Sequence, residues 1–246
     1  MKSHLVIKNH LESFVKDYLD KAEKVEAPCQ HFGDCGGCNF QDLSYETQLD
    51  LKKQKFLEIL KVDDMEEEFE DAEIEVVGSP EIFNYRQRMD FGGSEEKFGL
   101  RRIRGKRIFD LQECHLMRDG AYDAFDRMRE LAREAGLQGY DSYVHEGELR
   151  YLVVRQNKAG DRLLSLLTKT KNNEEAITKI AETLIAEGFA KSVHWLVNES
   201  LSDIAFGEEY RHWGEFYIDE TFHGRTYLLG PNTFFQSNPH VAEKAY

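Results

Sequence analysis

The chain has 246 residues, 41% of them hydrophobic, and a formal net charge of −14 at neutral pH. This length suffices for a sizeable core and fits one large or two small domains. Residues 1–20 contain no apolar secretion signal, and no segment approaches a membrane span. We therefore expect a cytoplasmic protein without a membrane partner, and a monomer.

The charge is unevenly distributed along the chain. Residues 63–75 hold nine acids and no base, whereas residues 97–107 hold six bases and no acid. Taken alone, the net charge of −14 argues against a nucleic-acid partner, because phosphate binding needs clustered Lys and Arg. The basic run keeps such a partner open, since one face of an acidic protein can be basic.

Two helices on either side of a cysteine-rich loop are expected in the N-terminal quarter. Residues 9–24 place apolar side chains along one side of a helix. A second helix, capped by Ser44 or Asp42, runs to about residue 61. The acidic residues after it are expected to form an exposed connection, and residues 74–77 begin a strand.

The remainder of the chain alternates short strands with helices, and tight turns are expected at Gly92-Gly93, at Arg104-Gly105 and across residues 158–161. Strands joined by both hairpins and helices predict an α+β fold, with a mixed, mostly antiparallel sheet and flanking helices. The expected strands are 85–91, 98–103, 107–111, 149–155, 163–168, 192–198, 215–218 and 226–229, and the expected helices are 122–136 and 174–187.

Four cysteines carry the strongest chemical signal. Cys29, Cys35 and Cys38 follow the spacing C-x5-C-x2-C, and 75 residues separate Cys38 from Cys114. A tight trio of thiolates closed by one distant thiolate is a common way to hold a [4Fe–4S] cluster. The glycines between the cysteines allow backbone N–H groups to turn toward the sulfurs.

Two other interpretations of the cysteines remain open. Structural zinc also takes four cysteines, although its usual signature is two short C-x2–4-C hooks. Four buried free cysteines are the plainer interpretation, but a CGGC sequence flanked by polar residues is not typical of a core. Disulfides need an oxidising compartment, and nothing in the sequence indicates export.

The segment Gly230–Pro239 is the second informative place. Asn238 followed by Pro239 is a strong helix start, with the asparagine as N-cap and the proline in the first turn. The chain then ends at Tyr246, about two turns into that helix. We therefore expect a truncated chain.

Four motifs resemble those of the S-adenosylmethionine-dependent RNA uracil-5-methyltransferases that carry an iron–sulfur cluster, of the type that acts on large-subunit ribosomal RNA. The run CQHFGDCGGCNFQ resembles the cluster loop of that family, and NYRQRMDF resembles its YRNKxxF strand. DLQEC resembles the strand end that brings the fourth ligand, and GPNTFFQSNP resembles its PxxFFQxNP motif. The resemblance implies four cluster ligands, namely Cys29, Cys35, Cys38 and Cys114.

The resemblance also implies a chemistry. In this family a cysteine thiolate adds to C6 of a flipped uracil, so that C5 can attack the methyl group of S-adenosylmethionine. The nucleophile and its base lie in a C-terminal Rossmann-like domain. We expect this domain to be missing from the chain, since no G-x-G-type loop is present and all four cysteines serve as ligands. The chain is therefore expected to be inactive, as the RNA-binding portion of a larger enzyme.

Further site residues are expected beside the cluster. Gln236 matches the family glutamine that reaches the methyl donor and the target base, with a turn-stabilising amide as the alternative. Phe234 and Phe235 can stack near the extruded base, although either can instead belong to the core. Of Arg86 and Arg88, one is expected to face RNA and one to be structural. The basic run can also be a solvated hairpin. The expected RNA-binding residues are Arg86, Arg101, Arg102, Arg104, Lys106, Arg107 and Phe234.

The expected domains are a helix-and-loop segment (1–61), an RNA-contacting α+β domain (72–229) and the start of a methyltransferase domain (230–246). Large-subunit ribosomal RNA is the favoured partner, with transfer RNA as the alternative, and the cluster is expected to be structural. Two other functions remain open. One is a non-catalytic iron–sulfur or zinc RNA-binding module, and the other is a redox carrier.

Overall fold

The computed structural model describes residues 4–62, 65, 67–69, 72–105 and 107–246. Lys106 and residues 63–64, 66 and 70–71 of the acidic stretch lie outside the described residues. The chain divides into two compact units. The helical unit comprises Met1–Phe32 and Cys38–Pro80, and the sheet unit comprises Gly33–Gly37 and Glu81–Tyr246.

The helical unit is built on α1 (His4–Lys21) and α2 (Tyr45–Val62), followed by the 3-10 turn η1 (Glu67–Phe69). Polar contacts join the two long helices, with His10 Nε2 lying 2.8 Å from Glu58 Oε2 and Tyr18 Oη donating to Asp50 Oδ2 at 2.6 Å. Both helices were expected from apolar periodicity.

The predicted cap of α2 is confirmed, whereas the strand predicted beyond this helix is wrong. Ser44 is confirmed as the cap of α2, because its hydroxyl oxygen accepts the Thr47 N–H at 3.1 Å. The expected strand at residues 74–77 is wrong, since these residues have no regular structure. The chain is instead held just after them, where the Ser79 N–H donates to Tyr45 Oη at 2.7 Å.

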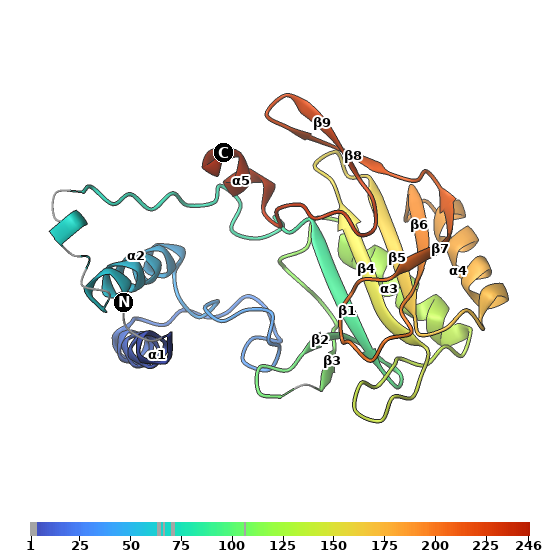
Figure 1. The fold of residues 1–246 in the computed structure, drawn as a ribbon, viewed down its shortest axis with the longest axis horizontal. Coiled ribbons are helices and arrows are strands. Elements are labelled where there is room, and N and C mark those ends of the chain that lie inside the picture. Colours follow the sequence, from blue (N-terminus) through green and yellow to red (C-terminus); the bar gives the residue numbers. More distant parts are fainter. Residues whose placement is uncertain (1–3, 63–64, 66, 70–71, 106) are drawn as a thin grey trace. The chain divides into compact units, whose positions relative to one another are not determined.

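The sheet unit contains a seven-stranded sheet in the order β3-β2-β1-β4-β5-β6-β7, in which β5 and β6 run parallel and the other neighbours antiparallel. Helices α3 and α4 cover one face, and α4 provides the crossover between β5 and β6 (Figure 1). The strands are β1 (Arg88–Ser94), β2 (Lys97–Arg101), β3 (Ile108–Asp110), β4 (Leu149–Gln156), β5 (Arg162–Thr168), β6 (Ser192–Val197) and β7 (Glu208–Gly214), and the helices are α3 (Ala121–Glu134) and α4 (Glu174–Ala186).

A separate hairpin and a short helix complete the sheet unit. The hairpin consists of β8 (Ile218–Phe222) and β9 (Arg225–Leu229), and the helix is α5 (Pro239–Ala245). Asn238 caps α5 as expected, since its side-chain oxygen accepts the N–H groups of His240 and Val241. The expected strand at 215–218 is misplaced, because β7 ends at Gly214 and β8 begins at Ile218.

The expected turn at Gly92-Gly93 is wrong, because both glycines lie within β1 and the turn comes at Glu95 and Glu96. A Cβ atom on Gly93 would lie 2.4 Å from Leu149 O and 2.8 Å from Gly139 Cα. Glycine is therefore required here for close backbone approach inside the sheet, which sequence alone does not distinguish from a turn.

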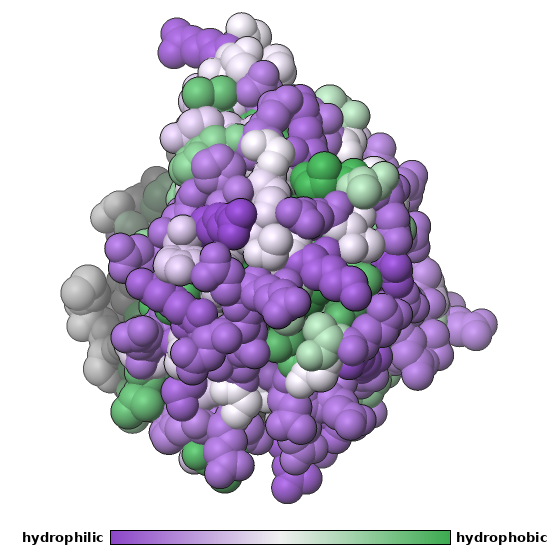
Figure 2. Space-filling model, turned by 90° about the vertical axis from the view of Figure 1, so that its right-hand side faces the viewer, coloured by the Kyte–Doolittle hydropathy of each residue, from purple (hydrophilic) through white to green (hydrophobic). Residues whose placement is uncertain are grey.

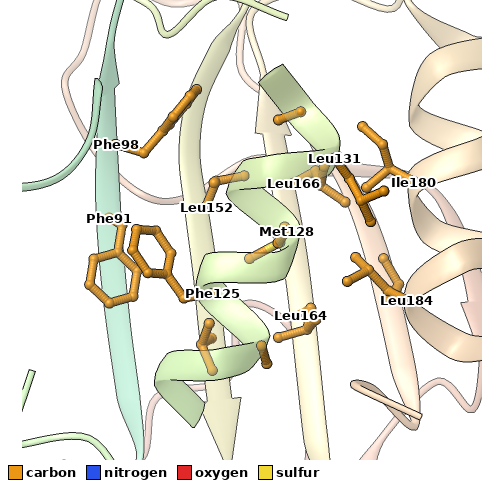
Figure 3. Packing of buried hydrophobic residues seen from close by; sticks show 14 of the residues in the cluster. Phe91, Phe98, Phe125, Met128, Leu131, Leu152, Leu164, Leu166, Ile180 and Leu184 are labelled. Carbon is orange, nitrogen blue, oxygen red and sulfur yellow. The ribbon is translucent and has the colours of Figure 1, made fainter. Parts of the chain in front are cut away.

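The core of the sheet unit lies between the sheet and the two helices. Phe125 of α3 stacks on Phe91 of β1 with ring centroids 3.8 Å apart, and Met128 and Leu131 continue the same helix face (Figure 3). This spacing of three and four residues is what the sequence predicted for α3. The helix stops where expected, at Gly136, which has φ +70°.

The outward faces of α3 and α4 are polar, and the face of the molecule drawn in Figure 2 is mostly hydrophilic, with apolar groups in small separate patches. None of the helices in the described ranges is both long and apolar enough to cross a bilayer.

Candidate functional site

The loop that carries Cys35 is held against the end of β2. The Gly36 N–H donates to Arg101 O at 2.8 Å, and the Ile103 N–H donates to Asp34 O at 2.9 Å. A Cβ atom on Gly36 would lie 2.9 Å from Arg101 O, so this close approach requires glycine. Residues 33–37 thus extend the sheet unit by a short antiparallel bridge between Cys35 and Arg102.

The Cys35 sulfur is placed to act as a thiolate ligand. It is half-buried against the core of the sheet unit, and it accepts the Gly37 N–H at 3.4 Å. Such a bond favours the charged sulfur that a metal requires. A Cβ atom on Gly37 would lie 2.9 Å from Leu100 Cδ1, which is the end of a flexible side chain and can shift.

Cys114 lies in the loop between β3 and α3. Its carbonyl accepts the Met117 N–H at 3.3 Å, and the Asn84 N–H donates to His115 O at 2.9 Å. Its half-buried side chain packs against the same core cluster as Cys35. Both thiol-bearing loops of the sheet unit are therefore fixed by backbone hydrogen bonds, which is the local order that a metal ligand needs.

Cys29 and Cys38 belong to the helical unit. The Cys29 N–H donates to Gln41 Oε1 at 3.3 Å, and the Phe32 N–H donates to Cys29 O at 3.0 Å. His31, between them in sequence, is buried. All four cysteines are half-buried and form no disulfide among the described residues. Soft sulfur donors on glycine-rich, ordered loops fit iron–sulfur or zinc chemistry, and the four-ligand set remains a prediction.

The basic run is only partly exposed to solvent. Arg101 pairs with Asp203, whose carboxylate also accepts the Tyr151 hydroxyl at 2.5 Å. Arg102 lies 2.8 Å from the Asp34 carboxylate and 5.0 Å from the centroid of the Phe109 ring. These two arginines therefore hold loops in place as well as carrying charge.

The remaining members of the run that the structure describes are exposed, and they include Lys97. Arg104 and Arg107 are exposed, and Lys106 lies outside the described residues. The distant partner of Arg101 had no signal in the sequence, because Asp203 is 102 residues away.

Arg88 has a structural position. It pairs with Asp90 at 2.8 Å and donates to the carbonyls of Pro231 and Ala205 at 2.8 and 3.1 Å. The half-buried Arg86 donates from Nε to Arg88 O at 3.1 Å. Arg88 is thus the structural member of the pair, and the contact of Arg86 with RNA remains a prediction.

The segment after β9 is held against the sheet unit by one buried side chain and one backbone hydrogen bond. Arg155, which is 2% exposed, donates to Thr233 O at 2.5 Å, and the Gln87 N–H donates to Ser237 O at 3.0 Å. Burial, together with the nearby charge of Arg88, lowers the pKa of Arg155 to about 10. The segment is therefore a fixed part of the sheet unit.

The side chains of this segment point in different directions. Phe234 is 82% exposed, whereas Phe235 packs against the small cluster of Leu163, Ile218 and Leu229. The half-buried Gln236 donates from Nε2 to Tyr246 Oη at 3.1 Å. Phe234 is therefore available for stacking, while Phe235 takes the core position that was the alternative for it.

A buried carboxylate lies near the same segment, and no pattern in the sequence indicated it. Glu220 of β8 is 1% exposed and accepts the Lys158 N–H at 3.1 Å and a hydrogen bond from the Gln87 amide. The Lys158 ammonium lies 3.9 Å from Glu220 and 2.5 Å from Glu243 of α5. This network ties the hairpin and α5 to the turn between β4 and β5.

No protein-family model matches the chain. It is 36% identical over 222 residues to a tRNA (uracil(54)-C(5))-methyltransferase of Pyrococcus horikoshii, covering 89% of this chain and 50% of that protein. It is 32% identical over 214 residues to a 23S rRNA (uracil(747)-C(5))-methyltransferase of Pyrococcus furiosus, covering 87% of this chain and 48% of that protein. The chain thus spans about half the length of the curated relatives it matches.

A solved structure is similar over the same extent. The crystal structure of Pyrococcus abyssi tRNA (uracil-54, C5)-methyltransferase in complex with S-adenosyl-L-homocysteine superposes with a TM-score of 0.72 and 30% identity. The superposition covers 91% of this chain and 50% of that one.

This superposition corrects the fold class expected from the sequence. From the sequence we expected an α+β fold with a cysteine loop. We also expected the C-terminal Rossmann-like methyltransferase domain to be missing. Instead, 91% of the chain superposes on half of a solved methyltransferase and shares its sheet-dominated fold, so the fold class expected from the sequence is wrong. The comparisons also give no support to the expectation that the chain is inactive.

Proposed function

This chain is related to the RNA uracil-5-methyltransferases, and we propose on that basis that it serves methyl transfer from S-adenosylmethionine to C5 of a uracil in transfer RNA. The observation that carries the proposal is the superposition, with a TM-score of 0.72, on a transfer-RNA enzyme that was crystallised with S-adenosyl-L-homocysteine. That molecule is the product of methyl donation, so the related fold serves this donor.

The choice of transfer RNA departs from the expectation of a ribosomal substrate. Identity to the transfer-RNA enzyme of P. horikoshii is 36%, against 32% to the ribosomal-RNA enzyme of P. furiosus. The superposed structure is also a transfer-RNA enzyme. These similarities favour transfer RNA, which was the alternative partner expected from the sequence.

The proposal assigns two roles within the fixed segment after β9. The exposed Phe234 ring is free to stack on a base, an interaction worth about 1–3 kcal/mol. The Gln236 amide can donate and accept hydrogen bonds at once, which suits recognition of a uracil edge. Arg155 and Arg88 fix the backbone that presents both side chains.

We further propose that Cys29, Cys35, Cys38 and Cys114 hold a [4Fe–4S] cluster. The Gly37 N–H bond to Cys35 and the glycine-dependent approach of the loop to β2 support this assignment. A cluster held by four thiolates would cross-link the cysteine loop to the strand end at Cys114, and uracil methylation requires no electron transfer. The residues therefore fit a structural cluster, with zinc as the alternative metal.

Methyl transfer is tested directly by supplying S-adenosylmethionine with a tritiated methyl group to the whole protein that contains this chain, because all four cysteines of the chain are assigned to the cluster and none remains as the thiolate nucleophile. We expect label in a transfer-RNA transcript and none in the same transcript with cytidine at position 54, the position named for the relatives. Gln236→Ala is expected to lower the rate about 100-fold because an interaction with the reacting base is lost. Ser237→Ala, at an exposed neighbouring position, is the matched control. Equal labelling of a ribosomal-RNA fragment, or no labelling of any RNA, would contradict the proposal.

RNA binding by the basic run is tested with Arg104→Glu combined with Arg107→Glu. Both side chains are exposed, so the double variant should fold normally. We expect weaker binding and a log–log salt slope that is shallower by about 2, because two phosphate contacts are lost. Lys179→Glu on the outer face of α4 should leave both quantities unchanged. Unchanged binding in the double variant would assign the run to a solvated hairpin.

A further inference from the structure

One face of β8 lies against the segment that carries Gln236. Ile218, Glu220 and Phe222 alternate along this strand, so their side chains share one face of it. Ile218 belongs to the apolar cluster against which Phe235 packs, and the ring centroids of Phe222 and Phe235 lie 5.8 Å apart. Glu220 comes between these two apolar side chains and is 1% exposed. A carboxylate is thus buried at the strand face that holds Phe235.

Glu220 holds the backbone on the other side of Gln236 through a second buried side chain, that of Gln87. The Gln87 amide donates to the Glu220 carboxylate, and both side chains are buried. The Gln87 N–H donates to Ser237 O at 3.0 Å, and Gln87 O accepts the Gln156 N–H at 2.8 Å. Gln87 therefore joins the carboxylate, the end of β4 and the residue that follows Gln236.

Donors and cations surround the Glu220 carboxylate, which is costly to bury without them. It accepts the Lys158 N–H at 3.1 Å and lies 3.9 Å from the Lys158 ammonium. Burial lowers the pKa of Arg118, and the charge of Glu220 acts against that shift. Both cations continue to α5, since Arg118 Nη2 lies 3.3 Å from His240 Nε2 and Lys158 Nζ donates to Glu243 at 2.5 Å. The carboxylate is therefore a fixed centre to which α5 is attached.

We propose that Glu220, acting through Gln87, positions Gln236 for methyl transfer to the uracil, a role that rests on the proposed function. Phe235 is held by the apolar side chains of β8 and Ser237 by Gln87, so both chain neighbours of Gln236 depend on the same strand. A displacement of about 1 Å at a group that contacts the reacting base lowers a rate by about 100-fold. Glu220 is buried away from any bound base and is therefore a positioning residue.

The hydrogen bond between Gln87 and Glu220 has a direction that substitutions can reverse. Gln87 Oε1 has no partner among the described residues. In Glu220→Gln the Gln87 amide can turn and accept a hydrogen bond from the new amide, so the contact persists. In Gln87→Glu two buried carboxylates face each other and repel. Adding Glu220→Gln to Gln87→Glu places a donor between them again, with the roles of the two side chains exchanged.

Methylation kinetics of these variants test the role, in the whole protein that contains this chain, with the transfer-RNA transcript as substrate. We expect Gln87→Glu to lower kcat about 30-fold and to leave KM for RNA within about twofold, because the exposed groups proposed to bind RNA are untouched. Glu220→Gln and the double variant should stay within about threefold of the wild-type kcat, since both keep the hydrogen bond. A change in KM alone, or a double variant as slow as Gln87→Glu, overturns the proposal.

Hydrogen exchange in the RNA-free protein separates this role from the proposed function. The amides of residues 234–243 should exchange at least about tenfold faster in Gln87→Glu, and the double variant should return them to the wild-type rate. Leu184→Ala, at a buried position of α4, is the control for lost stability and should lower the melting temperature without changing kcat. Unchanged exchange in Gln87→Glu overturns the positioning role alone. A wild-type protein that methylates no RNA overturns the proposed function and the role in the reaction together, whatever the exchange rates are.

Discussion

Replacing Cys114 by serine is expected to remove iron from the purified protein and to lower its melting temperature by about 10 °C. The substitution itself is small, because a hydroxyl group replaces a half-buried thiol. Most of the expected loss therefore comes from the metal, which stabilises only the folded chain in which its ligands converge. Iron and acid-labile sulfide per chain, measured after purification without oxygen, and a melting curve are the two readouts.

Gln112→Ala provides the matched control for Cys114→Ser. This side chain is two positions away in sequence and exposed, and it carries no thiol. We expect about four irons in the wild-type protein and in Gln112→Ala, as a [4Fe–4S] cluster requires. Unchanged iron in Cys114→Ser would remove this cysteine from the ligand set, and one zinc without sulfide would replace the cluster by a zinc site.

Gly99→Ala is expected to lower the free energy of unfolding of the sheet unit by about 4 kcal/mol, which is more than most single substitutions cause. A Cβ atom at this position would lie 2.0 Å from Phe109 O and 2.9 Å from Leu111 N, both backbone atoms of the neighbouring strand region. Because neither can move without breaking the pairing of β2 with β3, the strain cannot relax locally. Denaturant unfolding followed by circular dichroism measures this effect.

The same variant should also disturb the proposed cluster. The end of β2 holds the Cys35 loop through Arg101, and β3 leads into the loop of Cys114. We therefore expect Gly99→Ala to lose iron together with stability. Gly230→Ala is the control, because its nearest new contact is the exposed Tyr217 ring at 3.3 Å, which can shift. Equal unfolding midpoints for Gly99→Ala and the wild type would contradict the tight approach of β2 to β3.

Regular elements with a strong local pattern were predictable from the sequence. The helix now seen as α3 follows from apolar residues spaced by three and four, and β4 and β5 follow from apolar runs on either side of the turn at residues 158–161. The misplaced turn at Gly92-Gly93 has a physical cause. Glycine marks both turns and close backbone contacts, and only the neighbouring strands decide which one applies.

The candidate site was predictable where its signal is local. The cysteine spacing and the helix start at Asn238 both depend on residues a few positions apart. The pairing of Arg101 with Asp203 and the burial of Glu220 were not predictable, because their partners come from distant parts of the chain. The sequence accordingly did not indicate that Arg101 and Arg102 of the basic run hold loops in place.

The sequence by itself therefore determined the types of chemical group available, namely four thiols, a basic run and an aromatic–amide segment. Only the tertiary structure decided which of these groups solvent can reach. It exposes Phe234 and packs the partly buried Phe235 against Leu163, Ile218 and Leu229, although the two are identical neighbours in the chain. The physical reason is that exposure depends on which distant strands cover a side chain, and no short stretch of sequence contains that information.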